Sequence, residues 1–116
     1  MYSRKEESTN YQNESELVLA CPMTYTYTLL GKRWKPIILW KLHEGSRLVS
    51  DLLREIPLIS RKMLYQDLIE LHQHELINVE GEGVGKVHTL SPTGQSLIPL
   101  LQAMQTWGET HRPKTV

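Results

Sequence analysis

The sequence has little cysteine, no long apolar run and no excess charge of either sign. A single cysteine, Cys21, among 116 residues excludes a disulfide within one chain. No apolar stretch approaches the length of a membrane-spanning helix, and the N-terminus lacks the apolar core of a signal peptide. These absences favour a protein of the reducing cytoplasm with no membrane partner.

Charge is balanced overall but unevenly distributed. The 13 basic residues equal the 13 acidic ones, which argues against a general polycation and against a disordered acidic tail. Residues 21–62 nevertheless hold eight basic and only three acidic side chains, whereas both flanking segments are acidic on balance. A polyanion-binding surface needs this kind of concentration.

The length predicts one domain, and a chain this short often gains stability by oligomerising. Residues 2–16 are almost free of aliphatic side chains and rich in Ser, Thr, Asn, Gln and Glu. We therefore expect a flexible N-terminal tail over residues 1–16, a folded domain over residues 17–110 and a C-terminal tail over residues 111–116.

Proline, glycine and serine mark the ends of four predicted helices. The helices are expected to begin at Pro22, at Pro36, at Ser46 or Arg47, and at Ser60 as an N-cap. The first three end at Gly31, Gly45 and Pro57. The apolar face of the fourth helix is formed by leucines one turn apart, namely Leu64, Leu68 and Leu71.

A small β-hairpin and a last helix complete the predicted order. Segments 76–80 and 86–90 alternate partly and flank a glycine-rich loop, which is typical of a hairpin. Ser91 and Pro92 open the last helix, and Pro99 is expected to kink it. Helix-turn-helix followed by a hairpin is the winged helix-turn-helix arrangement, so the fold class is mainly α with a small β-hairpin. The second helix of such a pair normally enters the major groove of DNA.

Several segments, in this order and spacing, resemble the HxlR-type family of bacterial winged-helix regulators over about residues 21–108. They are Cys21-Pro22, Tyr25, Gly31 to Lys35, Ile38 to Trp40 with Leu42, Ile59 to Leu64, Leu68, Leu71, and Leu90 to Gly94. The resemblance implies a DNA-binding homodimer whose N- and C-terminal helices form the dimer interface. Lys32 stands where the family usually has a second glycine, His88 where an aromatic is common, and the shorter wing offers Lys86 as its only base.

The outward face of the fourth helix is the candidate DNA-reading surface. Arg61, Tyr65 and Gln66 are the predicted base contacts, because arginine can read guanine and glutamine can read adenine through paired hydrogen bonds. Phosphate contacts are expected from Ser46, Arg47, Ser60, Lys62 and Lys86. An ordinary solvated face is the alternative, but the helix-turn-helix pattern and the local basic charge favour DNA.

Cys21 lies directly before a helix-opening proline, and two interpretations of it stay open. The positive end of the helix dipole lowers a thiol pKa, and the resemblance implies that such a cysteine senses oxidants or electrophiles. A small electrophile, a small thiol or the partner's Cys21 could then modify it. Burial among Leu17, Leu19 and Met23 would instead raise the pKa and leave an inert packing residue.

No residue pattern indicates an enzyme. The five histidines lack metal-ligand spacing, so we expect no metal and no other cofactor. Trp34, Trp40 and Trp107 are expected to be core or interface anchors, with a planar-ligand pocket less favoured. The sequence predicts a homodimeric transcription regulator that binds double-stranded DNA. The alternatives are a winged-helix protein-interaction module and a small-ligand regulator independent of Cys21.

Overall fold

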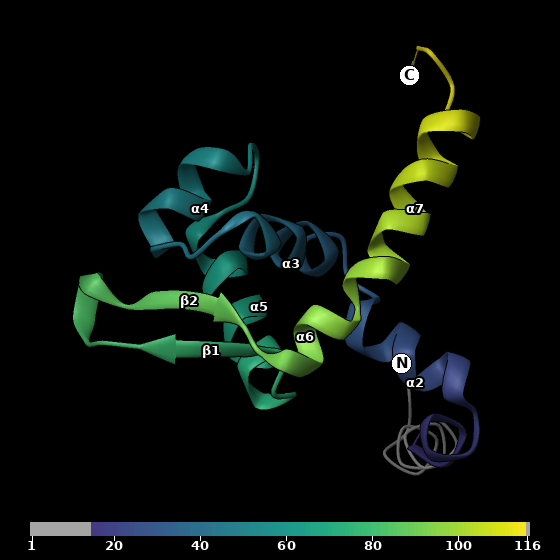
Figure 1. The fold of residues 1–116 in the computed structure, drawn as a ribbon, viewed down its shortest axis with the longest axis horizontal. Helices are drawn as coiled ribbons and strands as arrows, with labels where there is room; N and C mark the ends of the chain where they lie inside the picture. The colour runs from purple at the N-terminus through teal and green to yellow at the C-terminus, as the bar shows by residue number, and fades with distance from the viewer. Residues whose placement is uncertain (1–14, 116) are drawn as a thin grey trace, which may run out of the picture. The chain divides into compact units, whose positions relative to one another are not determined.

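The computed structural model describes residues 15–115, and the chain divides into two compact units, residues 1–31 and 32–116. In the first unit residues 15–20 are helical, and α2 follows at Pro22–Leu30 (Figure 1). Ser15 and Glu16 are thus helical where the sequence predicted the end of a tail. Residues 1–14 of that predicted tail lie outside the described residues, and the predicted domain boundaries stay a prediction.

Gly31 caps α2 at the predicted position, but for a different reason than expected. Its φ of −69° is not left-handed, so the usual glycine cap conformation is absent. A Cβ at Gly31 would lie 2.7 Å from the carbonyl oxygen of Tyr27. The close approach of the preceding turn, not backbone conformation, therefore explains the glycine.

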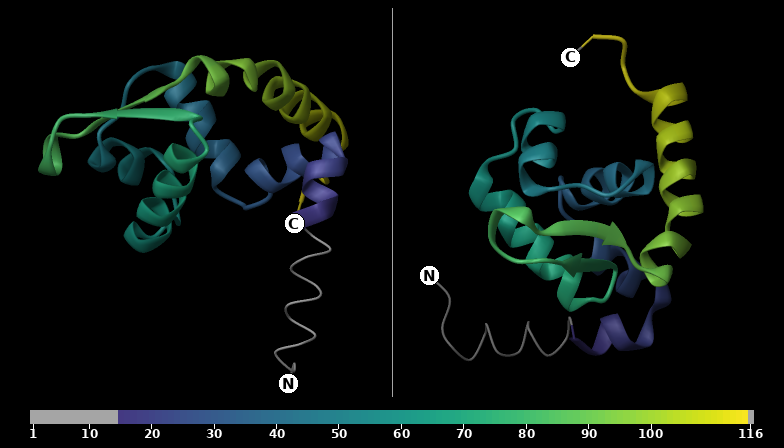
Figure 2. Two further views of the ribbon diagram at one scale, coloured as in Figure 1. Left: turned by 90° about the horizontal axis from the view of Figure 1, so that it is seen from below. Right: turned by 60° about the vertical axis from the view of Figure 1, so that its left-hand side comes forward.

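The second unit has the predicted winged-helix order. Its elements are α3 (Lys35–Glu44), α4 (Val49–Glu55), α5 (Arg61–Gln73), β1 (Ile77–Glu80), the short 3₁₀ turn η1 (Gly83–Gly85), β2 (Val87–Leu90), α6 (Pro92–Ser96) and α7 (Ile98–His111). The hairpin extends from one side of the packed α3, α4 and α5, and α7 extends from the other (Figures 1 and 2).

The hairpin is antiparallel, with Ile77 opposite Leu90 and Glu80 opposite Val87. A third backbone segment, which the sequence did not predict, pairs with it. The N–H of Arg47 donates to His88 O at 3.0 Å, and the N–H of His88 donates to Arg47 O at 2.8 Å. Arg47 was expected to lead into the third helix, but α4 begins only at Val49 because Arg47 is extended against β2.

The last predicted helix is two helices, which corrects the expected kink at Pro99. α6 ends at Ser96, and α7 begins at Ile98 with Pro99 in its first turn. Proline has no N–H to donate back to the preceding turn, but that donor is not needed in the first turn of a helix. The chain therefore restarts a helix before Pro99 and does not bend a continuous one through it.

In the second unit, aliphatic side chains of α3, α4, α5, α7 and β1 form the core. Ile38 and Leu39 of α3, Leu52 of α4 and Leu64 of α5 are fully buried. The predicted apolar face of α5 is confirmed, since Leu68 is also buried. Trp40 is an exception to the core prediction, because it is only half-buried.

Asp67 lies on the inner face of α5 among these apolar residues. Its relative exposure is 0%, and neither carboxylate oxygen has a hydrogen-bond partner within the described part of the chain. Burial raises the pKa of Asp67 above its ordinary value, although the nearby Lys32 and Lys35 charges oppose the shift. The folded protein therefore holds this proton more tightly than the unfolded chain does.

We expect Asp67→Asn to stabilise the protein in a pH-dependent way. A raised carboxyl pKa favours folding at low pH, and this contribution is lost as the pH rises from the unfolded value of about 3.9 through the folded value. At pH 7 the free energy of unfolding should rise by on the order of 1 kcal/mol, and the gain should shrink toward pH 4. Urea unfolding across this pH range measures it.

Glu70→Gln is the matched control for Asp67→Asn. Hydrogen bonds from Lys35 and Lys32 lower the pKa of Glu70, so its stabilising contribution is present at neutral pH and lost on acidification. The control should therefore destabilise the protein at pH 7. A gain for Asp67→Asn that does not vary with pH would contradict the assignment of a proton to Asp67.

Candidate nucleic-acid interface

The start of α5 has the geometry that the sequence predicts. The N–H of Met63 donates to the Ser60 Oγ at 3.1 Å, which satisfies one of the free donors of the first turn. The hydroxyl hydrogen of Ser60 is not used in this cap, and the residue is exposed. The first turn can therefore accept an anion at Ser60.

The outward face of α5 is open to solvent. Arg61, Lys62 and Gln66 are exposed, and the side chain of Tyr65 is 44% exposed. Among the described residues no carboxylate lies within 4.0 Å of the charged atoms of Arg61 or Lys62. The structure thus brings together four of the predicted contact residues, and none of their side chains has a hydrogen-bond partner among residues 15–115.

An ion pair that the sequence did not predict joins α5 to the start of α3. Lys35, at the start of α3, is only 4% exposed, and its Nζ lies 2.8 Å from Glu70 Oε2 on α5. Lys32 Nζ donates to both oxygens of the same carboxylate, at 3.0 and 3.1 Å. In the sequence, the only sign of this pair is a lysine between Trp34 and Pro36, and nothing nearby indicates that Glu70 is its partner.

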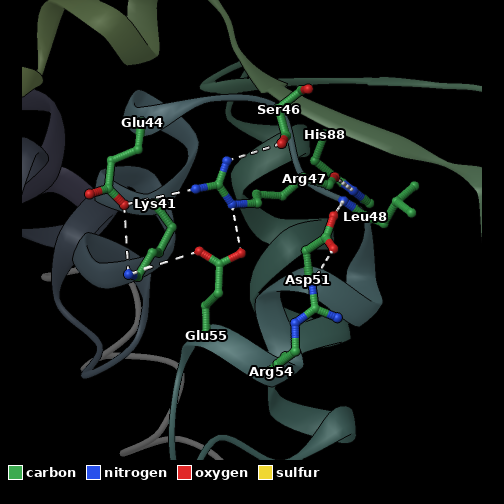
Figure 3. A network of polar contacts seen from close by, with 9 residues as sticks. All are labelled: Lys41, Glu44, Ser46, Arg47, Leu48, Asp51, Arg54, Glu55 and His88. Carbon is green, nitrogen blue, oxygen red and sulfur yellow. Dashed lines mark hydrogen bonds and ion pairs between the residues drawn. The ribbon is translucent and has the colours of Figure 1, made fainter.

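Arg47 is placed differently from its predicted role as a phosphate contact. Its Nε donates to Glu55 Oε2 at 2.8 Å, its Nη2 lies 3.9 Å from Glu44 Oε1, and its Nη1 donates to the carbonyl oxygen of Ser46 (Figure 3). The side chain is 18% exposed. Glu55 is bonded to this guanidinium and Glu44 lies near it, so the group is less accessible to an added anion than the exposed Arg61. The side chain of Ser46 remains exposed.

Lys86 is exposed at the end of the wing loop, directly before β2. The loop turns at Gly81 and Gly83, whose φ values of 92° and 59° favour glycine. His88, two residues on, is 4% exposed, and its Nδ1 lies 3.2 Å from Arg47 O. Burial lowers the pKa of His88, so the ring is neutral at pH 7 and donates its Nδ1–H to that carbonyl.

Most of the basic side chains in residues 21–62 form ion pairs with carboxylates of the same chain. Lys32 and Lys35 share Glu70, Lys41 and Arg47 lie beside Glu44 and Glu55, and Arg54 bonds to Asp51 at 2.7 Å. Arg33 lies 5.9 Å from the ring centroid of Trp34. The basic surface is therefore smaller than the linear count of charges suggests, and its strongest part is the start of α5.

In the first unit, Cys21 is the N-cap of α2 and is half-buried. No side-chain cap hydrogen bond forms there, but the hydroxyl and backbone N–H of Thr24 lie near the sulfur and lower the pKa of the thiol, against a smaller effect of burial. Leu19 and Met23 are 89% and 80% exposed, so they do not enclose the thiol. The hydrogen bonds from Thr24 favour the thiolate form, and the reactivity of Cys21 stays a prediction.

Trp40 lines a groove of about 400 Å³ between α3 and α7, with Ile37, Leu101 and Met104 among the other lining residues. Among residues 15–115 no three His, Cys, Asp or Glu side chains lie close enough together to hold a metal ion. No described helix is both long and apolar enough to cross a membrane.

The HxlR-like helix-turn-helix family model matches residues 29–116. The chain belongs to this family. The HTH-type transcriptional regulator YodB of Bacillus subtilis is 36% identical over 93 residues, which cover 77% of this chain and 83% of YodB. The predicted family is thus confirmed.

Solved structures of regulators have the same fold. The redox regulator HypR in its reduced form is 28% identical with a TM-score of 0.73, and the match covers 78% of this chain and 93% of HypR. Quinone-bound YodB from B. subtilis is 34% identical with a TM-score of 0.67, covering 78% and 98%. The predicted fold class is confirmed by these neighbours, and the relatives are transcription regulators.

Proposed function

We propose that this protein is a DNA-binding transcription regulator, without enzymatic activity, that acts as a homodimer in the cytoplasm and responds to oxidants or electrophiles through Cys21. The observation that carries the proposal is the exposed face of α5. It presents Arg61, Lys62, Tyr65 and Gln66 beside a capped helix start, in a chain that belongs to a helix-turn-helix family.

In this proposal α5 enters the major groove. Arg61, Tyr65 and Gln66 read base edges, while Ser46, Ser60, Lys62 and Lys86 contact phosphates. Two copies related by a twofold axis would place their α5 helices about 34 Å apart, one turn of DNA, on a near-palindromic site. Arg47 is left out of the phosphate contacts because its guanidinium is paired with Glu55.

The exposed apolar residues support the homodimer. In the first unit Leu17, Leu19 and Met23 are more than half exposed, and on α7 Met104 and Trp107 are 49% and 66% exposed. Exposed apolar side chains that gather on one helix are typical of interaction sites. The N- and C-terminal helices are therefore the proposed dimer surface, as the family resemblance implies.

The named properties of the relatives support the sensing role. HypR is named a redox regulator, and a structure of YodB contains bound quinone. In this chain the N-cap position and Thr24 lower the pKa of the Cys21 thiol, which raises the fraction of nucleophilic thiolate at neutral pH. An oxidant or an electrophile that reacts with thiolate is accordingly the proposed signal.

The DNA-binding proposal is tested by two substitutions on α5. Arg61→Ala should cost about 1–3 kcal/mol of binding to a specific site and relax the base preference at one position. Lys62→Ala should weaken all duplexes equally and lower the slope of log K against log salt by about one. Fluorescence anisotropy at several salt concentrations measures both. Normal binding by both folded variants would mean that α5 is not the reading helix.

The same titration tests the protein-interaction alternative. A winged-helix module that does not bind DNA would show no steep salt-dependent affinity for any duplex. Genomic selection of bound fragments, followed by the titration on the enriched site, separates the two functions.

The dimer should be present at micromolar concentration in sedimentation experiments. Trp107→Glu would place a charge on the exposed apolar end of α7 and should shift the protein toward monomer, because an unpaired charge is costly to bury. Glu109→Lys, a charge change on an exposed residue of the same helix, is the control. A wild-type monomer at this concentration would contradict the proposal.

Cys21 should react with a thiol probe faster than a free cysteine does at pH 7. Treatment with a quinone or a peroxide should then change the affinity for DNA, and Cys21→Ser should abolish this change. A response that persists in Cys21→Ser would favour the small-ligand alternative, for which the groove at Trp40 is a candidate site.

A further inference from the structure

Arg47 contacts α3, α4 and the wing, which is the hairpin of β1 and β2 with its loop. Its backbone pairs with His88 of β2 in both directions, at 3.0 and 2.8 Å. Its guanidinium contacts Glu55 at the end of α4 and lies near Glu44 at the end of α3 (Figure 3). One side chain and its own backbone therefore join the wing to two helices.

On the wing side of this junction, His88 is buried. His88 is 4% exposed and donates from Nδ1 to the same Arg47 carbonyl that accepts from its backbone N–H. Lys86 lies two residues before His88 and is exposed. A displacement of the Arg47 segment would thus be transmitted to Lys86 through the first two residues of β2.

We propose that Arg47 is a positioning residue for the wing: the Glu55 carboxylate holds its guanidinium, and its backbone fixes the start of β2 so that Lys86 meets a DNA phosphate. This proposal rests on the proposed DNA binding. It assigns Arg47 a role distinct from the phosphate contact that the sequence predicts.

The contacts favour positioning over direct DNA contact. The side chain is 18% exposed, its Nε is bonded to Glu55 at 2.8 Å, and Glu44, 3.9 Å away, would repel a phosphate. Arginine suits the site because its planar group donates to Glu55 from Nε while Nη1 donates to Ser46 O. A lysine has one nitrogen and cannot make both bonds in this geometry.

Hydrogen exchange in the absence of DNA tests the structural half of the proposal. Arg47→Ala keeps the backbone donors but removes the guanidinium, so the amides of residues 47 and 88 should exchange about tenfold faster or more. Arg54→Ala is the matched control, since Arg54 is 69% exposed on α4 and bonds only to Asp51 among the described residues. It should leave both amides protected. Unchanged protection in Arg47→Ala would overturn the proposal.

Salt titrations of DNA binding test the functional half. Lys86→Ala should lower the salt slope by about one, Arg47→Ala by the same amount, and the double variant by no more than about one, because both remove the same contact. Two independent phosphate contacts would instead lower the slope by about two in the double variant, which would overturn positioning.

Glu55→Gln changes the affinity for DNA in opposite directions for the two possible roles of Arg47, wing positioning and direct DNA contact. It also provides a test if Arg47→Ala does not fold. If Arg47 positions the wing, loss of its carboxylate partner should weaken binding and lower the salt slope. If Arg47 contacts DNA, the variant frees a cation and removes a negative charge, so binding should strengthen and the proposal fails. If the wild type shows no salt-dependent DNA binding, the proposed function is refuted. The hydrogen-exchange result would still decide separately whether Arg47 fixes the wing.

Discussion

The ion pair between Lys35 and Glu70 is the interaction on which the geometry of the proposed DNA-reading face of α5 depends. A lysine that is 4% exposed would be costly to bury alone, and Glu70 at 2.8 Å offsets that cost. Removing one partner of a fully buried pair typically costs about 3–5 kcal/mol, and the cost here is smaller because water reaches Glu70, whose side chain is 28% exposed. The pair joins the start of α3 to α5. It therefore limits the orientations in which α5 can present Arg61 and Lys62.

Arg47 forms a second charged junction, near the end of α3. There a cation of the basic stretch is held by carboxylates at the ends of α3 and α4, and its backbone carries the wing. α5 and the hairpin, the two elements expected to meet DNA, are thus each fixed to α3 through a charged junction. Ion pairs depend on direction and distance more than apolar contacts do, so they suit joints whose geometry matters.

Local signals in the sequence predicted most of the fold, and non-local pairings account for what was missed. Pro22, Ser60 and the leucines of α5 act within one or two turns, so their effects could be read directly. Pro99 was recognised as a disruption, but whether a proline kinks a helix or begins one depends on the preceding residues. The bond between Lys32 and Glu70 joins residues 38 positions apart, and that between His88 and Arg47 spans 41. No local pattern encodes such partners, so both junctions could be found only in the structure.

The same pairings explain how a chain with no net charge could bind a polyanion. The acidic residues Glu44, Glu55 and Glu70 lie against cations that serve the joints between elements. Arg61 and Lys62 have no such partner among the described residues, and both lie on the solvent-exposed face of α5. Zero net charge weakens long-range attraction to any duplex, while cations concentrated on one helix would still supply the contacts that the proposed function assigns to α5. Affinity would then depend more on the fit of α5 to a particular site than on charge alone, which is the balance that a specific regulator requires.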